Sequence, residues 1–454
     1  MRIESIPYRD PIHYLAYFPQ ANLVFLDSAK KHHSLGRFSY LAVDPFNHLV
    51  LQPELASLHR LSFYLQRYQT ETVANIPPFQ GGLAGYFSYE WLHFLEKLPP
   101  RQKQRLHMPL GQLGCYDIIL SFDHVLQQAW IVSSGFPETE WEKRQQRAEH
   151  RLRWVKEKLA RTPLTRETPF TFDTPLTCWL AKNDYLHAVQ KVKNYILDGD
   201  IFQANIARCY HTSFSKKENA YALYQRLRTL NPAPFAAFLQ FPHCTLLSSS
   251  PERFIHVNGN RVETRPIKGT SARHSDPRLD AQLAIRLQQD PKERAENTMI
   301  VDLMRNDLSK VCVASSIEVP EYCAIETYQT VHHLVSAITG QLKPSCTALQ
   351  VLQATFPGGS ITGAPKIRAM EIIDEIEPIQ RGPYCGAIGY LAFNGNMDTS
   401  ITIRTLILDD THLYFHTGSA IVLDSDPQKE WLETEAKACA LKQLIEQVTD
   451  DFVH

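Results

Sequence analysis

Apolar and polar positions recur with two different spacings along the chain, and together they predict strands mixed with helices. Short apolar runs at 117–120 and 129–132 have the composition of buried strands. Further on, the strand-like run 412–422 follows other strands without a helix in between. Because strands that follow one another directly tend to pair antiparallel, the pattern predicts an α+β fold with large antiparallel sheets.

A stretch rich in Thr and Pro at 161–177 divides this pattern into two parts. It follows a charged helical segment at 138–159 and has the composition of a linker. The sequence therefore predicts an N-terminal part, residues 1–160, and a C-terminal part, residues 178–454. Neither part contains an internal repeat or a low-complexity tract.

Composition excludes several classes of protein. The 454 residues include 47 Lys and Arg and 48 Asp and Glu, and a net charge of -1 excludes nucleic-acid binding by bulk charge. No apolar run reaches the roughly 18 residues of a membrane helix. The nine cysteines form no C-x-x-C pair, and the first residues lack a basic segment followed by an apolar one. We therefore expect a cytoplasmic protein with reduced thiols, no zinc site and no membrane contact.

Two helices of the C-terminal part carry acidic residues next to their apolar faces. One begins at 290–291, where Asp, Pro and, three residues after the cap, Glu293 form a strong helix start. Glu296 borders the apolar stripe of this helix. The stripe consists of Ala295, Met299, Ile300, Leu303 and Met304. A second helix begins at 426–427, with Glu430 and Glu433 on the side that becomes apolar further along.

These inward-facing carboxylates on two separate helices are candidates for binding one cation. The pair is Glu296 and Glu433, with Glu430 behind them. Hard oxygen ligands with few protein contacts suit Mg²⁺, which keeps several waters and binds an anionic substrate alongside. The alternative is that the acids pair with Lys or Arg where two subdomains meet, and pattern alone favours that alternative.

Two further segments are suited to binding a carboxylate. The glycine-rich turn 358–365 precedes a helix that ends before Pro378, and small residues at a helix N-terminus let an anion approach the backbone. The turn lacks phosphate-loop spacing, and it would equally serve to close a strand–helix joint. The run 397–404 alternates and places Arg404 on its polar face. That arrangement suits bidentate carboxylate binding, although a solvated Arg on a half-exposed strand is commoner.

A lysine and a glutamate are brought together by a hairpin signal at 258–259. A loop of two or three residues places Glu252 opposite Arg265 or Pro266, within reach of Lys268. A Lys beside a carboxylate suits a nucleophile with its base. The alternative is a cross-strand salt bridge, which pattern alone favours.

Eight segments taken together are more specific than any of these patterns. In chain order they read SPERF, TRPIKGT, AENTMIVDLMRNDL, VHHLVS, FPGGSITGAPK, GAIGY, MDTSITIRT and EWLET. The chain resembles the chorismate-utilising enzymes, which include anthranilate synthase component I, aminodeoxychorismate synthase component I, and isochorismate and salicylate synthases. The resemblance is dense from about 199 to 442. It is thinner before that, with 36–39 and 78–82 as the best anchors.

The resemblance implies a fold, a substrate and a metal. The family has an anthranilate synthase component I-like fold, with two interleaved subdomains, large antiparallel sheets and helices outside. It binds chorismate and Mg²⁺, so by motif position Glu296 and Glu433 are expected to hold the metal, with Glu430 behind it. The other implied residues are Thr362 and Gly363 at the ring carboxylate, Tyr390 and Arg404 at the enolpyruvyl carboxylate, His333 near the reacting ring, and Gly418 in a turn that usually has more glycines.

Two positions distinguish branches of this family. Isochorismate and salicylate synthases have a water-activating Lys where this chain has Gln203, which is not a base, so the ammonia-using branch is favoured. Anthranilate synthases typically read P-I-A-G-T, whereas this chain has Lys268 in P-I-K-G-T and resembles aminodeoxychorismate synthases. The resemblance implies that Lys268 attacks C2 of chorismate, with Glu252 as its base, and that ammonia then displaces it by attack at C4. The implied product is 4-amino-4-deoxychorismate, a precursor of 4-aminobenzoate and folate.

The resemblance also implies a partner and a second ligand. The family's ammonia usually comes from a glutamine amidotransferase, and the chain has no obvious segment of that kind, so a partner subunit is expected. Family members often bind tryptophan, and two segments here match the family's pocket. The residues expected there are Ser28, Asn231, Pro232 and Phe235. Two alternatives stay open, an anthranilate synthase component I and a non-catalytic chorismate-binding subunit.

Overall fold

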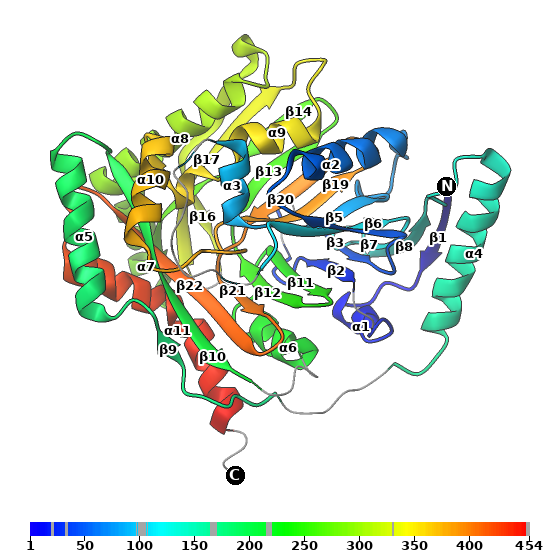
Figure 1. Ribbon diagram of the computed structural model, residues 1–454, viewed down its shortest axis with the longest axis horizontal. Coiled ribbons are helices and arrows are strands. Elements are labelled where there is room, and N and C mark those ends of the chain that lie inside the picture. Colours follow the sequence, from blue (N-terminus) through cyan, green and yellow to red (C-terminus); the bar gives the residue numbers. More distant parts are fainter. Residues whose placement is uncertain are drawn as a thin grey trace.

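The computed structural model describes residues 1–19, 22–31, 35–96, 98, 106, 108–163, 170–214, 220–328 and 331–450. Two large antiparallel sheets form the centre of the molecule, and the helices lie outside them (Figure 1). This arrangement confirms the predicted α+β class. Within the described ranges, no helix is long and apolar enough to cross a membrane.

The first sheet joins strands from both parts of the chain. In spatial order they are β1 (Arg2–Ile6), β8 (Gln128–Ser133), β7 (Ile118–Asp123), β3 (Phe38–Ala42), β2 (Leu23–Asp27), β11 (Phe235–Phe241), β12 (Cys244–Ser250), β21 (Thr405–Leu408), β22 (His412–Ile421), β10 (Gln203–Ser213) and β18 (Gly363–Ala364), with β9 (Thr177–Cys178) also on β10. The N-terminal strands end at β2, which pairs with β11 of the C-terminal part.

The second sheet is built in the same mixed way. Its order is β15 (Ile267–Ala272), β17 (Val331–Gln341), β14 (Arg261–Thr264), β13 (Arg253–Asn258), β20 (Met397–Ile401), β19 (Ala387–Ala392), β5 (Gly82–Phe87), β6 (Gly111–Tyr116) and β4 (Asn47–Leu51), with β16 (Glu318–Thr327) also on β17. Here β19 pairs with β5 across the two parts. The two parts are therefore interleaved, and neither forms a sheet of its own.

Helices cover the outer faces of both sheets. They are α1 (Ile12–Leu15), α2 (Leu55–Arg67), α3 (Leu92–Leu95), α4 (Trp141–Leu159), α5 (Lys182–Leu197), α6 (Ala220–Leu230), α7 (Pro277–Gln289), α8 (Pro291–Ser309), α9 (Ala348–Thr355), α10 (Lys366–Ile376) and α11 (Pro427–Asp450), with 3-10 turns η1 (Tyr89–Trp91), η2 (Ala314–Ser316) and η3 (Gly359–Ile361). The helices α5, α10 and α11 pack on β10 and β22, and α8 packs on β17.

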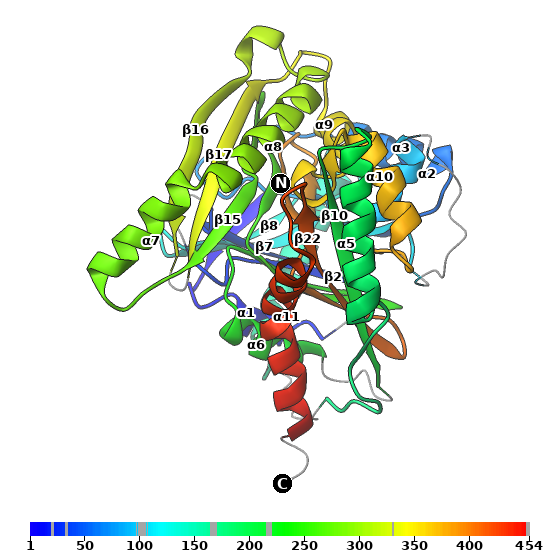
Figure 2. The ribbon, with the colours of Figure 1, turned by 90° about the vertical axis from the view of Figure 1, so that its left-hand side faces the viewer.

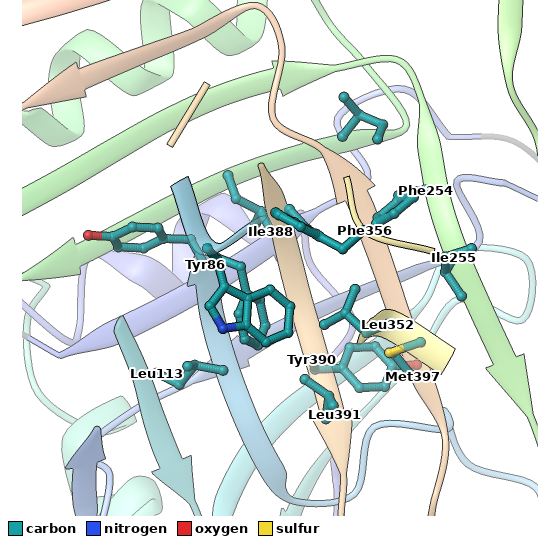
Figure 3. Packing of buried hydrophobic residues seen from close by; sticks show 14 of the residues in the cluster. Tyr86, Leu113, Phe254, Ile255, Leu352, Phe356, Ile388, Tyr390, Leu391 and Met397 are labelled. Carbon is teal, nitrogen blue, oxygen red and sulfur yellow. The ribbon is translucent and has the colours of Figure 1, made fainter. Parts of the chain in front are cut away.

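Hydrophobic cores lie on both faces of the first sheet. One core fills the space between the two sheets, where Figure 3 shows Tyr86 of β5 and Ile388 of β19 among its members. The other lies beneath α1, α4, α6 and α11. Along β7, Ile119 belongs to the first core and Leu120 to the second. Burial on both faces explains why this strand is a continuous apolar run.

The predicted linker lies only partly within the described residues, because 164–169 fall outside them. Its last residues are fixed to the first sheet. The ring of Phe170 lies 5.0 Å from that of Phe214, and Asp173 donates its N–H to Ser213. Strand β9 then pairs with β10. The segment therefore joins two parts that share both sheets.

Candidate active site

Chemistry-bearing side chains converge where β10, β18 and β22 of the first sheet approach β15 of the second, beneath α8 and α11. Figure 2 shows this face of the molecule, with α8, α10 and α11 around β10 and β22. The local sequence explains how α8, the first of the two acidic helices, begins. Asp290 caps α8 by accepting the N–H groups of Lys292 and Glu293, and Pro291 occupies its first position.

Lys268 and Glu252 meet through a third residue, Ser360. The ammonium of Lys268 donates to the carbonyl oxygen of Ser360 at 3.2 Å, and the Ser360 hydroxyl donates to Glu252 at 2.7 Å. Glu252 also accepts the N–H of Ile267 at 3.3 Å. The sequence predicted that Glu252 lies opposite Arg265 or Pro266. The hairpin instead pairs Asn258 with residue 261, and Glu252 lies beside Ile267, one residue further along the chain.

Burial moves the pKa of each of these two groups toward its neutral form. It raises the pKa of Glu252 to about 6, against the opposing effects of Ser360, the Ile267 N–H and Lys268. It lowers the pKa of Lys268, although the charge of Glu296 acts in the other direction. A lysine that acts as a nucleophile must be neutral, and a general base works best with a pKa near the working pH. The pair therefore has the electrostatics of a nucleophile with its base.

The acids of α8 and α11 face one another across the site. The ammonium of Lys292 lies 3.9 Å from Glu296 and 3.8 Å from Glu430, so carboxylates from both helices already share one cation. Glu430 is buried and accepts hydrogen bonds from Ser425 at 2.6 Å and from Ser419. The lysine contact corresponds to the alternative of lysine pairing, and the metal pair Glu296 and Glu433 stays a prediction.

Glu433 is the more exposed of the predicted metal pair. Burial opposes its ionisation, but the ammonium of Lys437 at 2.6 Å outweighs this effect and lowers its pKa. The pKa of Glu296 is raised by burial. In the described part of the chain no three metal-ligating side chains come close enough to form a metal centre by themselves. The donors are all carboxylate oxygens on facing helices, which fits a hard cation completed by other ligands.

Glu293 is an acid that the sequence interpretation used only as a helix-start signal. A methyl group on Gly269 would lie 2.8 Å from a carboxylate oxygen of Glu293, so this acid contacts the strand that carries Lys268. Its pKa is raised by burial and by the charge of Glu296. Its position three residues before Glu296, on the same helix face, is the signal that identifies it.

Arg404 and His333 lie on the other side of the site. The strand β20 ends at Ile401, and Arg404 has a φ of 50°, so the expected alternation does not continue to the arginine. Burial lowers the pKa of Arg404, while Glu252 acts in the opposite direction. His333 shares a hydrogen bond of 2.9 Å with the hydroxyl of Thr270, and burial together with the charge of Arg404 lowers its pKa to about 4. His333 is therefore neutral at pH 7.

Tyr390 does not lie with Arg404, contrary to the expectation from the GAIGY motif. Its ring stacks on Phe79 at 4.4 Å and lines a separate cavity. The tyrosine at the site is Tyr384, six residues earlier, which the sequence interpretation missed. A methyl group on Gly418 would lie 3.1 Å from the Tyr384 hydroxyl, and the ring stacks on His416 at 4.9 Å.

Two expected glycines lie where only a glycine fits closely. A methyl group on Gly363 would lie 2.1 Å from the carbonyl oxygen of Gln203, and one on Gly418 would lie 2.7 Å from Oδ1 of Asn205. Thr362 is fully buried, and its hydroxyl donates to the carbonyl oxygen of Gly358 at 2.9 Å. The Thr362 hydroxyl therefore stabilises the turn, so at this residue a ligand would be bound by backbone groups and not by the side chain.

A second cavity of about 570 Å³ lies near the expected tryptophan residues. Ser28 and Phe235 line it, together with Tyr390, Arg253 and Asp398. Arg253 and Asp398 form a paired contact at 3.1 and 3.0 Å on its wall. The other two expected residues, Asn231 and Pro232, are not among the residues that line this cavity. Two of the four expected residues therefore line this cavity, and tryptophan binding stays a prediction.

Comparison with known proteins identifies the family. A sequence profile described as chorismate binding enzyme matches residues 21–443. The chain is a member of this family. It is therefore an enzyme that acts on chorismate.

Named relatives agree with this assignment. The chain is 38% identical to aminodeoxychorismate synthase component 1 of Salmonella typhimurium, over 97% of this chain and 98% of the relative. It is 42% identical to the protein of the same name from Escherichia coli, over 81% and 78% of the two chains. Among solved structures, anthranilate synthase component I from Streptococcus pneumoniae superposes with a TM-score of 0.77 at 30% identity, covering 90% and 92% of the two chains.

Proposed function

We propose that the chain is the chorismate-binding component of an aminodeoxychorismate synthase. It converts chorismate and ammonia to 4-amino-4-deoxychorismate, a precursor of 4-aminobenzoate and folate. The observation that carries this proposal is the buried Lys268, which shares Ser360 with the carboxyl group of Glu252. The relatives at 38% and 42% identity have the same name, which supports the same activity.

The chemistry consists of two allylic displacements. In the first, the neutral amine of Lys268 attacks C2 of chorismate and the C4 hydroxyl leaves; Glu252 takes the proton from the amine, and the hydroxide leaves as water once protonated. In the second, ammonia attacks C4, the bond between C2 and Lys268 breaks, and the lysine regains a proton. The net reaction joins chorismate and ammonia and releases one water. Gln203 cannot activate water as a base, which favours this reaction over water addition.

Residues of this chain hold the two carboxylates of chorismate. Arg404 and the Tyr384 hydroxyl are suited to the enolpyruvyl carboxylate, and the backbone at Gly363 to the ring carboxylate. Mg²⁺ would be held by Glu296 and Glu433, with acids from the same helices behind them, and would supply positive charge at the ring carboxylate.

Ammonia comes from a second protein in this proposal. The relatives are named component 1, which implies a further component. We expect that component to be a glutamine amidotransferase. The second cavity is the proposed tryptophan site, because it combines the aromatic Phe235 with the charges of Arg253 and Asp398.

The test is product analysis with the purified chain, chorismate, Mg²⁺ and ammonium. The proposal predicts 4-amino-4-deoxychorismate, and it predicts that glutamine replaces ammonium only after an amidotransferase subunit is added. Anthranilate as the product would favour the anthranilate synthase alternative, and unchanged chorismate would favour a non-catalytic subunit. Product formed from glutamine by the chain alone would contradict the need for a partner.

A further inference from the structure

The turn that carries Gly363 has its carbonyl groups fixed by three buried cations. Lys366 donates to the carbonyl oxygens of Thr355 at 2.9 Å and of Pro357 at 2.8 Å. Arg381 donates to that of Ile361 at 2.9 Å, and Lys268 to that of Ser360 at 3.2 Å. Only the last of these cations has a place in the proposed reaction.

The remaining carbonyl groups of the same turn are also bound. The hydroxyl and the N–H of Thr362 donate to Gly358 and Gly359, and the N–H of Asn205 donates to the carbonyl oxygen of Thr362 at 2.7 Å. Every carbonyl group from 357 to 362 therefore accepts a hydrogen bond.

Fixing these carbonyl groups also fixes the direction of the N–H groups. In a trans peptide the carbonyl and the N–H of one peptide unit point in opposite directions. The carbonyl of Thr362 is held toward β10, so the N–H of Gly363, in the same peptide unit, points away from β10. Since β18 is the last strand of its sheet in the described part of the chain, this N–H lies at the free edge of the sheet.

Each of the two additional cations has a buried counter-ion on a neighbouring element. Lys366 contacts Asp307 of α8 at 2.5 Å, on the helix that also carries Glu296. Arg381 binds Glu377 at 2.9 and 2.6 Å and also donates to the carbonyl oxygen of Asn205 at 2.7 Å. The pairs thus connect the turn to α8 on one side and to β10 on the other.

Buried ion pairs of this kind contribute little net stability, because desolvation offsets much of their attraction. Their clearest physical effect here is geometric. We propose that Lys366 and Arg381 are positioning residues that hold the carbonyl side of the turn, so that its N–H side receives the ring carboxylate of chorismate. This inference rests on the proposed chorismate site at Gly363.

The first test neutralises one pair as a unit. The double variant K366M/D307L replaces both charges by apolar groups. It leaves no buried charge unpaired, because Lys310, which also contacts Asp307 at 3.1 Å, is about half exposed and stays hydrated. We expect the KM for chorismate to rise about tenfold, the size of one charge-assisted hydrogen bond, with kcat within about twofold of wild type. A partly unfolded sample lowers the apparent kcat and leaves KM unchanged, so KM separates positioning from folding. A KM within twofold of wild type would overturn the proposal.

A second variant keeps the test decisive if the double variant does not fold. R381K keeps the positive charge beside Glu377. A lysine ammonium, however, cannot replace the planar guanidinium group of Arg381, which binds Ile361, Asn205 and Glu377 at the same time. We expect a similar rise in KM, and the melting temperature of R381K shows whether the variant is folded at the assay temperature. An unchanged KM in R381K overturns the role of Arg381 and, where K366M/D307L is unfolded, the whole proposal.

The matched control is an exposed ion pair that joins α10 to α5. Lys191 contacts Glu375 at 2.5 Å, and both side chains are about half exposed. The variant K191M/E375Q should leave KM for chorismate unchanged. Failure of the proposed function can be distinguished from failure of this inference. If the wild-type enzyme made anthranilate, the proposed function would be wrong, but the KM for chorismate could still be measured in the wild type and in each variant.

Discussion

At the scale of single residues, burial gives Lys268 and Glu252 the protonation behaviour that covalent chemistry needs. Each group loses part of its preference for the charged form, so a proton passes from the lysine to the glutamate at a smaller cost than in water. Ser360 joins the pair through its hydroxyl and its carbonyl. The glutamate must be ionised to act as a base, which gives the pair a defined pH dependence.

The first prediction concerns that pH dependence. Below the Glu252 pKa of about 6 the carboxyl group is protonated and cannot accept the lysine proton, so attack by Lys268 should slow about tenfold per pH unit below 6 and level off above it. Glu252→Gln should remove this limb and slow the step about 100-fold or more. The measurement is the rate of chorismate attachment without ammonia. Glu321→Gln, at a half-exposed salt bridge to Arg265, is the control. A rate independent of pH from 5 to 8 would contradict the assignment.

The second prediction concerns the acids on facing helices. Glu296→Gln or Glu433→Gln should reduce turnover about 100-fold or more and raise the Mg²⁺ concentration required, because each removes a charge from a site with few protein ligands. The melting temperature should change little, since each of these acids is paired with a lysine whose side chain is nearly half exposed and stays hydrated. Asp302→Asn, at an exposed position of α8, is the control. Full activity after chelation of divalent cations would show the metal assignment to be wrong.

Residue identity was easier to predict than residue location. The motifs led to Lys268, Glu252 and His333, and the structure brings all three to the same region. They also led to Tyr390 in place of Tyr384, because two tyrosines six residues apart are equally compatible with a local motif. Tyr390 packs at 5.5 Å from Tyr40 of β3, a contact that depends on pairing between distant strands.

At the scale of elements, helix starts were predictable because their signals are local. The Asp-Pro pairs at 290–291 and 426–427 do begin helices. The prediction of the buried face of α8 was less accurate, since Ala295 is exposed and Asn297 is buried. The polar Asn297 is buried because its side chain accepts a hydrogen bond from Ser336 of β17, which the hydrophobic pattern does not encode.

The third prediction compares two glycines of the site. Gly363→Ala places a methyl group 2.1 Å from a backbone oxygen of β10, so it should destabilise the fold by about 1–3 kcal/mol. Gly418→Ala places its methyl group 2.7 Å from Oδ1 of Asn205 and 2.9 Å from the backbone oxygen of Ile206. These contacts are less close than the one at Gly363, so this variant should raise KM with a smaller loss of stability. Thermal unfolding and steady-state kinetics measure the two effects. Equal losses of stability in both variants would contradict the distinction.

At the scale of the whole molecule, the sequence predicted the class of fold but not how its halves combine. Both sheets cross the predicted boundary at 161–177, through β2 with β11 and β19 with β5. Composition locates a linker and gives no information on long-range strand pairing. Interleaving explains how one fold carries two separate sites, the chorismate site and the second cavity.

The fourth prediction concerns the second cavity. If it binds tryptophan, millimolar tryptophan should raise the melting temperature, because a ligand that binds only the folded state stabilises it by mass action, by about 2.7 kcal/mol at 100 times Kd. Phe235→Ala should abolish the shift, while Phe63→Ala, at an exposed position of α2, should keep it. A melting temperature unaffected by tryptophan in the wild-type protein would contradict the assignment of this cavity.

The central claim is that Lys268 becomes covalently attached to the substrate. The direct measurement is mass spectrometry of the protein quenched after mixing with chorismate and Mg²⁺ in the absence of ammonia, followed by digestion. The account predicts that the peptide containing Lys268 gains the mass of chorismate less one water, and that Lys268→Ala gains nothing and no longer makes 4-amino-4-deoxychorismate. A Lys268→Ala variant that forms this product at the wild-type rate would contradict the account and leave the Lys268–Glu252 pair as an ordinary salt bridge.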